Sequence, residues 1–259
     1  MEWKVILKNY KFLLTLMMPI NFTLALHETG LSAQPTGNSP DFTVLVFTKT
    51  AAFRHASIPD GIKAIQFLAD QHHFQAEASE DAAIFTDENL ARYRGVIFLN
   101  TSGDILNQEQ QAAFERFIRK GGGFIGIHSA TDTEYKWPWY GQLVGAYFKN
   151  HPPIQTATVK VVDSTHISTK TLPAEWVRTD EWYNFQEDPS ARVNVLIKID
   201  ETTYSGGSMG ENHPISWYHE YEGGRAWYTA MGHTKETYGD PLFLDHLWGG
   251  IRWATGAAE

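Results

Sequence analysis

The sequence contains no cysteine among its 259 residues. This absence excludes a thiol nucleophile, a disulfide bond and lipid attachment through a cysteine. It does not indicate a compartment, because a protein without cysteine is compatible with an oxidising periplasm and with a reducing cytoplasm.

Positive charge is also scarce. The chain has 21 Lys and Arg residues against 30 Asp and Glu residues, which gives a formal net charge of -9. No cluster of Lys and Arg provides a local exception, so the protein should repel phosphate backbones and anionic membranes. We therefore expect no nucleic-acid partner.

No apolar run is long enough to cross a bilayer comfortably. The run at 12–26, "FLLTLMMPINFTLAL", is interrupted by Pro19 and Asn21, and three lysines precede it. A small-residue site ending at Ala33 follows. We predict that residues 1–33 are a secretory signal peptide, so that the processed protein is periplasmic or secreted and retains no membrane span. An uncleaved membrane anchor is the weaker alternative.

The rest of the chain predicts a short linker and one α/β domain. Residues 34–41, "QPTGNSPD", have linker composition, and residues 42–256 have a length that suits one domain. Continuous apolar runs typical of buried strands alternate with helical patterns in its first half. The strands are expected at 42–47, 95–100 and 123–127, and the helices at 58–74 and after a capping box formed by Asn107 and Gln110. This alternation predicts a parallel sheet with helices on both faces.

The second half predicts an antiparallel addition to that sheet. Strand patterns occur at 156–163, 193–200, 213–221 and 224–232, and the last two are separated by "EGG", which favours a hairpin. An amphipathic helix at 240–256 closes the domain.

The segment "GGGFIGIHSATDT" (121–133) predicts a nucleophile elbow with a histidine at its tip. Such an elbow is a strained turn between strand and helix that needs small residues on both sides, as Gly126 and Ala130 provide around His128. We expect the imidazole of His128 to face a crevice at the carboxyl end of a central strand, where it can transfer protons or bind a metal. The alternative is a structural histidine in the core.

Other polar residues follow the predicted strands. Arg54 and His55 come after the first strand, and His233 follows the hairpin. Asp132 lies close after His128 and either orients it or favours a helix N-terminus. The alternative for Arg54 and His55 is that they are polar surface residues of an exposed loop and bind no ligand.

The pair Asp180 and Glu181 lies in "TDEWYNF" (179–185), and on a strand its two side chains face opposite sides. Glu181, beside Trp182 and Tyr183, is the better candidate for an acid or base, and an exposed strand carboxylate is the alternative.

The segment "EYKWPWYGQ" (134–142) concentrates aromatic side chains near the elbow. A short loop does not easily bury four large rings, and an exposed indole face suits the C–H face of a sugar. Trp137 and Trp139 are therefore predicted to stack on a carbohydrate, with core packing as the alternative.

No metal motif is present. The 11 histidines include no compact HxH or HExxH spacing, so no cofactor is predicted, and a divalent metal bound by scattered ligands stays open.

Several of these segments together resemble the ThuA-like (trehalose utilisation) family over about residues 42–256. They are "FRHAS", "GGGFIGIHSATDT", "WPWYGQLVGAYFKNHP", "DEWYNF", "HPISWYHEYEGGRAWYTAMGHT" and "LWGGIRWATG". The resemblance implies a flavodoxin-like, class I glutamine amidotransferase-like fold, in which a cysteine normally occupies the elbow. His128 stands there instead, and without a thiolate glutamine hydrolysis is excluded.

The resemblance also implies a function in carbohydrate metabolism. Members of the family are associated with uptake and breakdown of disaccharides and with 3-keto sugars, and His55, His128, Glu181 and His233 match recurring polar residues of the family. Our leading hypothesis is an exported enzyme that cleaves or converts a disaccharide or 3-keto-glycoside, as a hydrolase or by elimination. Its catalytic residues would be His128, Glu181 and His233, and its substrate-binding residues Arg54, His55, Asp132, Trp137 and Trp139. The alternatives are a sugar-binding accessory protein and a metal-dependent hydrolase. The sequence predicts no oligomeric state.

Overall fold

Within residues 40–257, which the computed structural model describes, the largest element is a nine-stranded mixed sheet. Its strand order is β2-β1-β3-β4-β11-β10-β9-β6-β7. The predicted signal peptide and residues 34–39 of the predicted linker lie outside the described residues. None of the described helices is both long enough and apolar enough to cross a membrane.

The first five strands in this order run parallel to one another. They are β2 (Gln75–Ser79), β1 (Thr43–Phe47), β3 (Gly95–Leu99), β4 (Gly123–Ile127) and β11 (Gly224–Thr229). The remaining strands, β10 (Pro214–Tyr221), β9 (Asn194–Ile199), β6 (Gln155–Val161) and β7 (Glu175–Asp180), pair antiparallel. A separate two-stranded sheet joins β5 (Phe148–Asn150) to β8 (Asn184–Phe185). The predicted parallel sheet and its antiparallel addition are both confirmed, and β11 of the predicted hairpin connects them.

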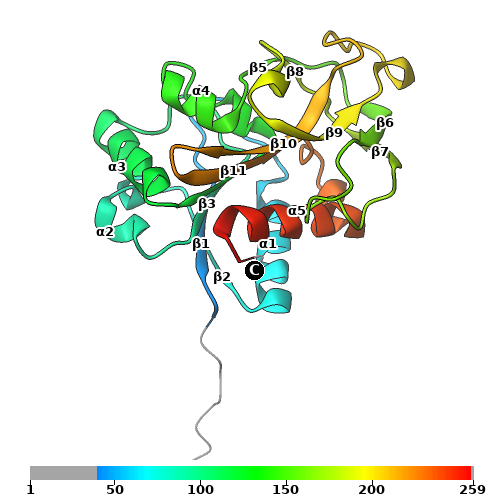
Figure 1. Ribbon diagram of the computed structural model, residues 1–259. Helices are drawn as coiled ribbons and strands as arrows, with labels where there is room; N and C mark the ends of the chain where they lie inside the picture. The colour runs from blue at the N-terminus through cyan, green and yellow to red at the C-terminus, as the bar shows by residue number, and fades with distance from the viewer. Residues whose placement is uncertain (1–39, 258–259) are drawn as a thin grey trace, which may run out of the picture. The chain divides into compact units, whose positions relative to one another are not determined.

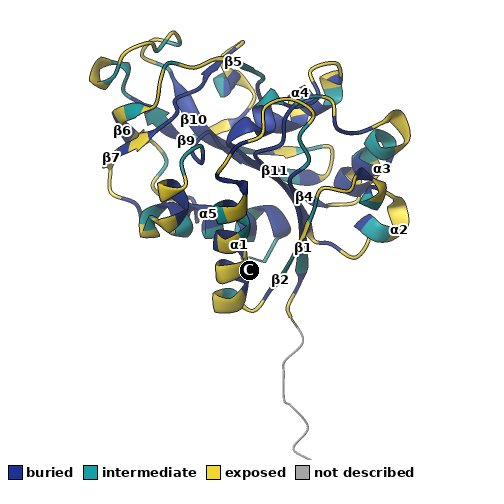
Figure 2. Cartoon of the chain, turned by 180° about the vertical axis from the view of Figure 1, so that it is seen from behind, coloured by how far each residue is buried: buried dark blue, intermediate teal, exposed yellow. Residues whose placement is uncertain are grey.

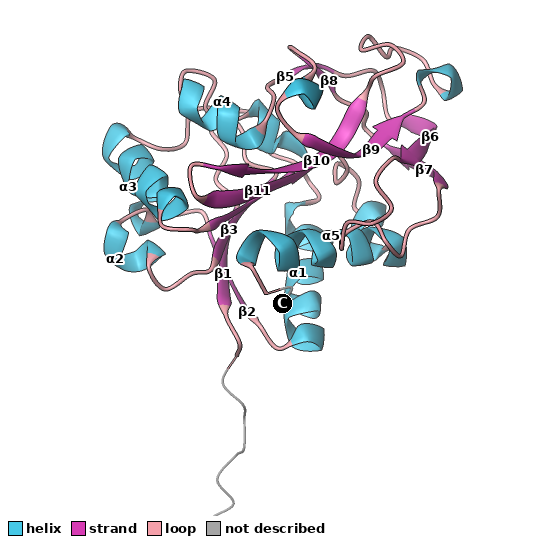
Figure 3. Cartoon of the chain, viewed as in Figure 1, coloured by secondary structure: helices cyan, strands magenta, loops and turns pink. Residues whose placement is uncertain are grey.

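Helices cover both faces of the sheet (Figure 1 and Figure 3). They are α1 (Ile58–His72), α2 (Asp87–Leu90), α3 (Gln108–Arg119), α4 (Pro138–Val144) and α5 (Pro241–Thr255). Helices α1 and α5 pack together on one face, and α2 and α3 pack together on the other. Successive side chains of β3 point to opposite faces of the sheet and contact different helices. Phe98 stacks on Phe114 of α3, whereas Leu99 lies against Gly61 of α1. Burial on both sides explains the continuous apolar composition of these strands (Figure 2).

Three elements differ from the sequence prediction. Helix α1 ends at His72, two residues before the predicted end, because His73 adopts a left-handed conformation with φ 58°. Strand β2 follows and was not predicted, because "QAEAS" is an edge strand that has no fully buried residue and no apolar run. The aromatic loop predicted at 134–142 is in part helix α4, which begins with proline at its first position.

The imidazole of His246 in α5 is buried and donates a hydrogen bond from Nδ1 to the Ser168 carbonyl at 2.8 Å. Desolvation lowers the pKa of His246 from 6.5 to about 3. The folded pKa lies below the unfolded one, so the associated stability is fully present above pH 6.5 and is lost as the pH falls toward the folded pKa.

We expect the titration of His246 to lower the free energy of unfolding by about 2 kcal/mol when the pH falls from 6.5 to 4.5. Denaturant titrations at these two pH values measure the difference. The variant His246→Asn should lose less stability over that interval, whatever its stability at pH 6.5. The matched control His73→Asn changes an exposed histidine and should keep the wild-type dependence. An unchanged pH dependence in His246→Asn would contradict the prediction.

Candidate active site

His128 lies at a strained turn immediately after β4. Its φ of 50° is left-handed, which costs free energy for a residue with a side chain. A Cβ atom on Gly126 would lie 3.0 Å from the Tyr228 ring and 3.2 Å from the Cβ of Ala130, so there is little room for a side chain there. The elbow geometry predicted from the spacing is therefore present, and it is followed by a turn of 3-10 helix, His128–Asp132.

The ring of His128 does not face an open crevice as predicted. The residue is 0% exposed, its Nδ1 donates a hydrogen bond to the Ala230 carbonyl at 2.7 Å, and the Tyr183 ring covers it with centroids 4.2 Å apart. The turn directs the side chain under the residues that follow β7 and β11. His128 is thus a buried support of the site, and its neighbours form the accessible surface.

That surface belongs to a pocket of about 290 Å³, called here the histidine pocket. Its lining residues are Phe53, His55, Asp132, Phe148, His151, Glu181, Tyr183 and His233. His55, Asp132, Glu181 and His233 follow β1, β4, β7 and β11 respectively. The first, second and fourth of these strands are parallel, and open α/β sheets bind ligands at the carboxyl ends of such strands.

Glu181 is the centre of the polar contacts. Its Oε2 lies 3.4 Å from His128 Nε2 and 3.0 Å from His233 Nδ1. Its Oε1 lies 3.0 Å from His151 Nδ1. The rings of His55 and His233 meet edge to face with centroids 5.0 Å apart. One carboxylate therefore has imidazoles around both of its oxygens.

These contacts separate the protonation equilibria of the cluster. Burial by itself raises the pKa of Glu181, but the neighbouring imidazoles of His128 and His233 outweigh it and hold the pKa well below its usual range. Burial opposes the protonation of His233, yet the Glu181 carboxylate raises its pKa. Burial, with repulsion from His128 and His233, lowers the pKa of His55 to about 2. Glu181 is therefore an anion, His55 is neutral, and His233 is the imidazole that holds a proton more readily.

Asp180 fixes the positions of two members of the cluster. This buried carboxylate accepts hydrogen bonds from the backbone N–H groups of Glu181 at 2.9 Å, His233 at 3.1 Å and Gly232 at 2.9 Å. The Thr237 hydroxyl donates to it at 2.9 Å. As the alternation of a strand predicts, Glu181 lines the pocket and Asp180 does not. Asp180 supports the site without belonging to its surface.

Three predicted substrate-binding residues lie elsewhere. Arg54 pairs with Glu80 at 2.5 Å on the exposed surface and does not line the histidine pocket. Trp137 is buried, stacks on Trp139 with centroids 5.1 Å apart and donates its indole N–H to Glu115. The prediction that a short loop does not easily bury these rings was wrong for Trp137. The segment containing α4 packs Trp137 and the half-buried Trp139 against α3, where Phe114 contacts both indoles.

Asp132 does line the pocket, and it accepts a hydrogen bond from the Tyr135 hydroxyl at 2.6 Å. Burial raises the pKa of this carboxyl group, although the Tyr135 hydrogen bond opposes the shift. Glu134, two residues further along the chain, accepts hydrogen bonds from the backbone N–H groups of Ile105 and Leu106 and has a structural role.

His151 was not predicted from the sequence, although its side chain is 41% exposed at the pocket and contacts Glu181. It precedes Pro152 and Pro153 in a loop, and an isolated loop histidine indicates nothing by its spacing. Phe53, Phe148 and Tyr183 were also missed as pocket walls. The only available signal for Phe53 and Tyr183 was their adjacency to predicted site residues.

Four of the polar residues come close enough to share an ion. His55, His128, Glu181 and His233 each offer one ligand atom, and within residues 40–257 these atoms lie within 4.8 Å of one another. A metal site of scattered ligands, left open by the sequence, is thus geometrically available.

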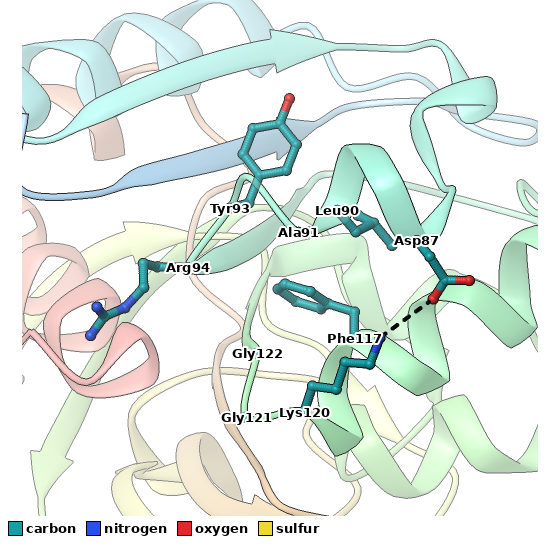
Figure 4. A pocket seen from close by; sticks show the side chains of 9 residues that line it. All are labelled: Asp87, Leu90, Ala91, Tyr93, Arg94, Phe117, Lys120, Gly121 and Gly122. Carbon is teal, nitrogen blue, oxygen red and sulfur yellow. Dashed lines mark ion pairs between the residues drawn. The ribbon is translucent and has the colours of Figure 1, made fainter.

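A second pocket of about 290 Å³ lies at the opposite end of the sheet. Figure 4 shows Lys120 reaching toward Asp87, with Tyr93 and Arg94, which precede β3, drawn away from this pair. Because this end carries the amino termini of the parallel strands, it is the less favoured side for a ligand in this class of fold.

The model of the family named ThuA, described as trehalose utilisation, matches residues 43–254. The chain belongs to the ThuA family. Its function is therefore related to carbohydrate metabolism. No curated protein matches the sequence.

Solved structures agree with this assignment. A ThuA-like protein from Bacteroides uniformis is 26% identical, with a TM-score of 0.72 and coverage of 86% of this chain and 94% of that one. A ThuA-like protein from Parabacteroides merdae is 20% identical, with a TM-score of 0.71 and coverage of 84% and 91%. A β-galactosidase from Bacillus circulans is 14% identical, with a TM-score of 0.55, and 83% of this chain covers 31% of that one, which shows a shared fold alone. The flavodoxin-like architecture is thus common to this chain and its ThuA-like neighbours.

Proposed function

We propose that this ThuA-family protein is an exported enzyme that converts a disaccharide or 3-keto-glycoside by acid/base chemistry in the histidine pocket. One observation carries the proposal: Glu181 holds His128 and His233 at one oxygen and the accessible His151 at the other. A sugar-binding protein without catalysis needs no such ordered set of proton-transferring groups.

A ketone at C3 of a sugar acidifies the neighbouring C2–H. His151, at the pocket, removes that proton, the C1–O bond breaks, and the resulting imidazolium returns the proton to the departing oxygen. His233, whose pKa is raised by Glu181, stabilises the negative charge that develops on the carbonyl oxygen. Glu181 and the buried His128 hold His233 in place. The sequence assigned catalysis to His128, Glu181 and His233. The proposal keeps His233 in a catalytic role, gives Glu181 and His128 a positioning role, and adds His151 as the proton carrier.

Aromatic side chains of the histidine pocket provide the surface on which a sugar ring can stack. Phe148 and Tyr183 lie with ring centroids 4.3 Å apart, and Phe53 packs edge to face against His55 at 4.8 Å. Phe53 is 62% exposed and has a face available to a ligand. These rings take the role that the sequence assigned to Trp137 and Trp139.

The change His151→Ala should lower turnover of the best substrate in a panel of disaccharides and their 3-keto derivatives by about 100- to 10,000-fold. Because His151 is half-exposed, its removal should leave the thermal unfolding temperature nearly unchanged. The matched control His73→Asn alters an exposed histidine at the far end of the sheet and should retain activity. Wild-type turnover in His151→Ala would refute this mechanism, and sugar binding by the wild type without turnover on any panel member would favour the accessory-protein alternative.

The change Phe53→Ala should raise KM by about 2- to 12-fold, which corresponds to the 0.5–1.5 kcal/mol of an aromatic contact, with little effect on kcat. The control Phe67→Ala removes a comparably exposed ring, 52% exposed, on α1 outside the histidine pocket. Steady-state kinetics of the two variants and the wild type on one substrate give the KM and kcat values to compare. Equal KM values for Phe53→Ala and the wild type would rule out stacking on Phe53.

Export is part of the proposal and is supported by the lysines, apolar run and small-residue site of residues 1–33. Mass spectrometry of the protein recovered from a Gram-negative host should find a mature N-terminus at Gln34 in the periplasmic fraction. Recovery of the chain with residues 1–33 intact from the cytoplasm would contradict export.

A further inference from the structure

Three of the four ligand-type atoms at the base of the histidine pocket are spaced nearly as they would be around one metal ion. Two ligand atoms at 2.0–2.1 Å from a tetrahedral ion lie about 3.3–3.4 Å apart. His128 Nε2 lies 3.4 Å from Glu181 Oε2 and 3.3 Å from His233 Nδ1, and the Glu181–His233 distance is 3.0 Å. His55 completes a group whose atoms all lie within 4.8 Å of one another.

The hydrogen bonds of His128 favour a cation between these atoms. Nδ1 faces the Ala230 carbonyl at 2.7 Å, and because a carbonyl oxygen only accepts, Nδ1 carries a proton. In the neutral ring Nε2 then presents a lone pair, which faces the Glu181 carboxylate and a nitrogen of His233. A ring that donates its other N–H to a backbone carbonyl is the usual arrangement of a histidine that binds a metal.

We propose that His55, His128, Glu181 and His233 bind one divalent transition-metal ion of the Zn²⁺ type. Three imidazoles and one carboxylate suit Zn²⁺ and similar ions, whereas Mg²⁺ and Ca²⁺ prefer oxygen ligands. The four residues follow different strands, and Asp180 fixes two of them by backbone hydrogen bonds, so the site is organised before an ion binds.

The ion has a definite use if the proposed function is correct. With its four protein ligands in place, the ion would accept the carbonyl oxygen of the substrate as a fifth ligand. It would then take over from His233 the stabilisation of charge on that oxygen, since a bound divalent cation polarises a carbonyl as a Lewis acid. His151 is outside the group of four and stays free to carry the proton. Metal binding itself does not depend on the proposed function, but its catalytic use rests on it.

The test counts metal in the full chain without any sugar present. Protein stripped with a chelator and dialysed against Zn²⁺ should retain one ion per chain by mass spectrometry of the metal, and protein dialysed against Mg²⁺ should retain none. Because His128 is buried at a left-handed position, His128→Ala can fail to fold. His233→Ala and Glu181→Ala, checked for native circular dichroism, are the variants of choice.

Each of these two variants should weaken Zn²⁺ binding by at least about 100-fold in calorimetric titration, which exceeds the 10- to 100-fold cost typical of changes outside the ligand shell. His73→Asn removes an exposed histidine and should bind as the wild type does. Zn²⁺ retained at well below one ion per wild-type chain, or bound with wild-type affinity by folded His233→Ala and Glu181→Ala, overturns the site. Wild-type turnover by metal-free protein overturns the ion's catalytic use alone. Failure of the sugar panel with one Zn²⁺ bound refutes the proposed function and leaves the metal site standing.

Discussion

The hydrogen bonds of Asp180 hold the two sides of the site together. Asp180 ends β7, which is four places from β11 in the strand order, and at about 4.8 Å per strand a flat sheet would separate them by about 19 Å. Yet Asp180 Oδ2 accepts from the Gly232 backbone N–H, just after β11, at 2.9 Å. The antiparallel half of the sheet must therefore curl back over the carboxyl ends of the parallel half. Glu181 and His233 meet because one buried carboxylate binds the backbone of both.

The left-handed turn at His128 has a cost that the surrounding contacts offset. Backbone strain of this kind persists where neighbouring structure enforces it, and here Gly126 and Ala130 leave room for the turn while the Ala230 carbonyl fixes the ring. A shorter polar side chain at position 128 would tolerate the same backbone but would not reach Glu181. The strained backbone of His128 thus places its Nε2 atom next to Glu181.

The sequence predicted the parts of the fold and site that depend on local patterns. Buried parallel strands are continuous apolar runs, and the elbow requires small residues at fixed offsets, so β1, β3, β4 and the position of His128 were visible. The polar edge strand β2 has no such pattern. The four metal-ligand candidates lie 73, 53 and 52 residues apart along the chain, so no short motif could indicate that they converge.

The indoles of Trp137 and Trp139 show a different limit of sequence reasoning. Aromatic composition indicated rings in need of a partner, but it did not distinguish a sugar from another part of the protein. The partner is α3, through Phe114, and this contact exists only because residues 138–144 form a helix instead of an open loop. Packing that depends on tertiary contacts cannot be inferred from the composition of one segment.

The histidines of the site differ in depth, and depth determines what each can do. His128 is fully buried and His55 nearly so, and neither can readily exchange protons with solvent in a closed cluster. His151 is half-exposed, and it contacts Oε1 of Glu181, whereas His128 lies near Oε2 of the same carboxylate. A group that must take up and release a proton in every catalytic cycle needs access to substrate and water, whereas a group that holds charge is more effective where the dielectric constant is low. The carboxylate of Glu181 lies at the boundary between these two environments and couples them.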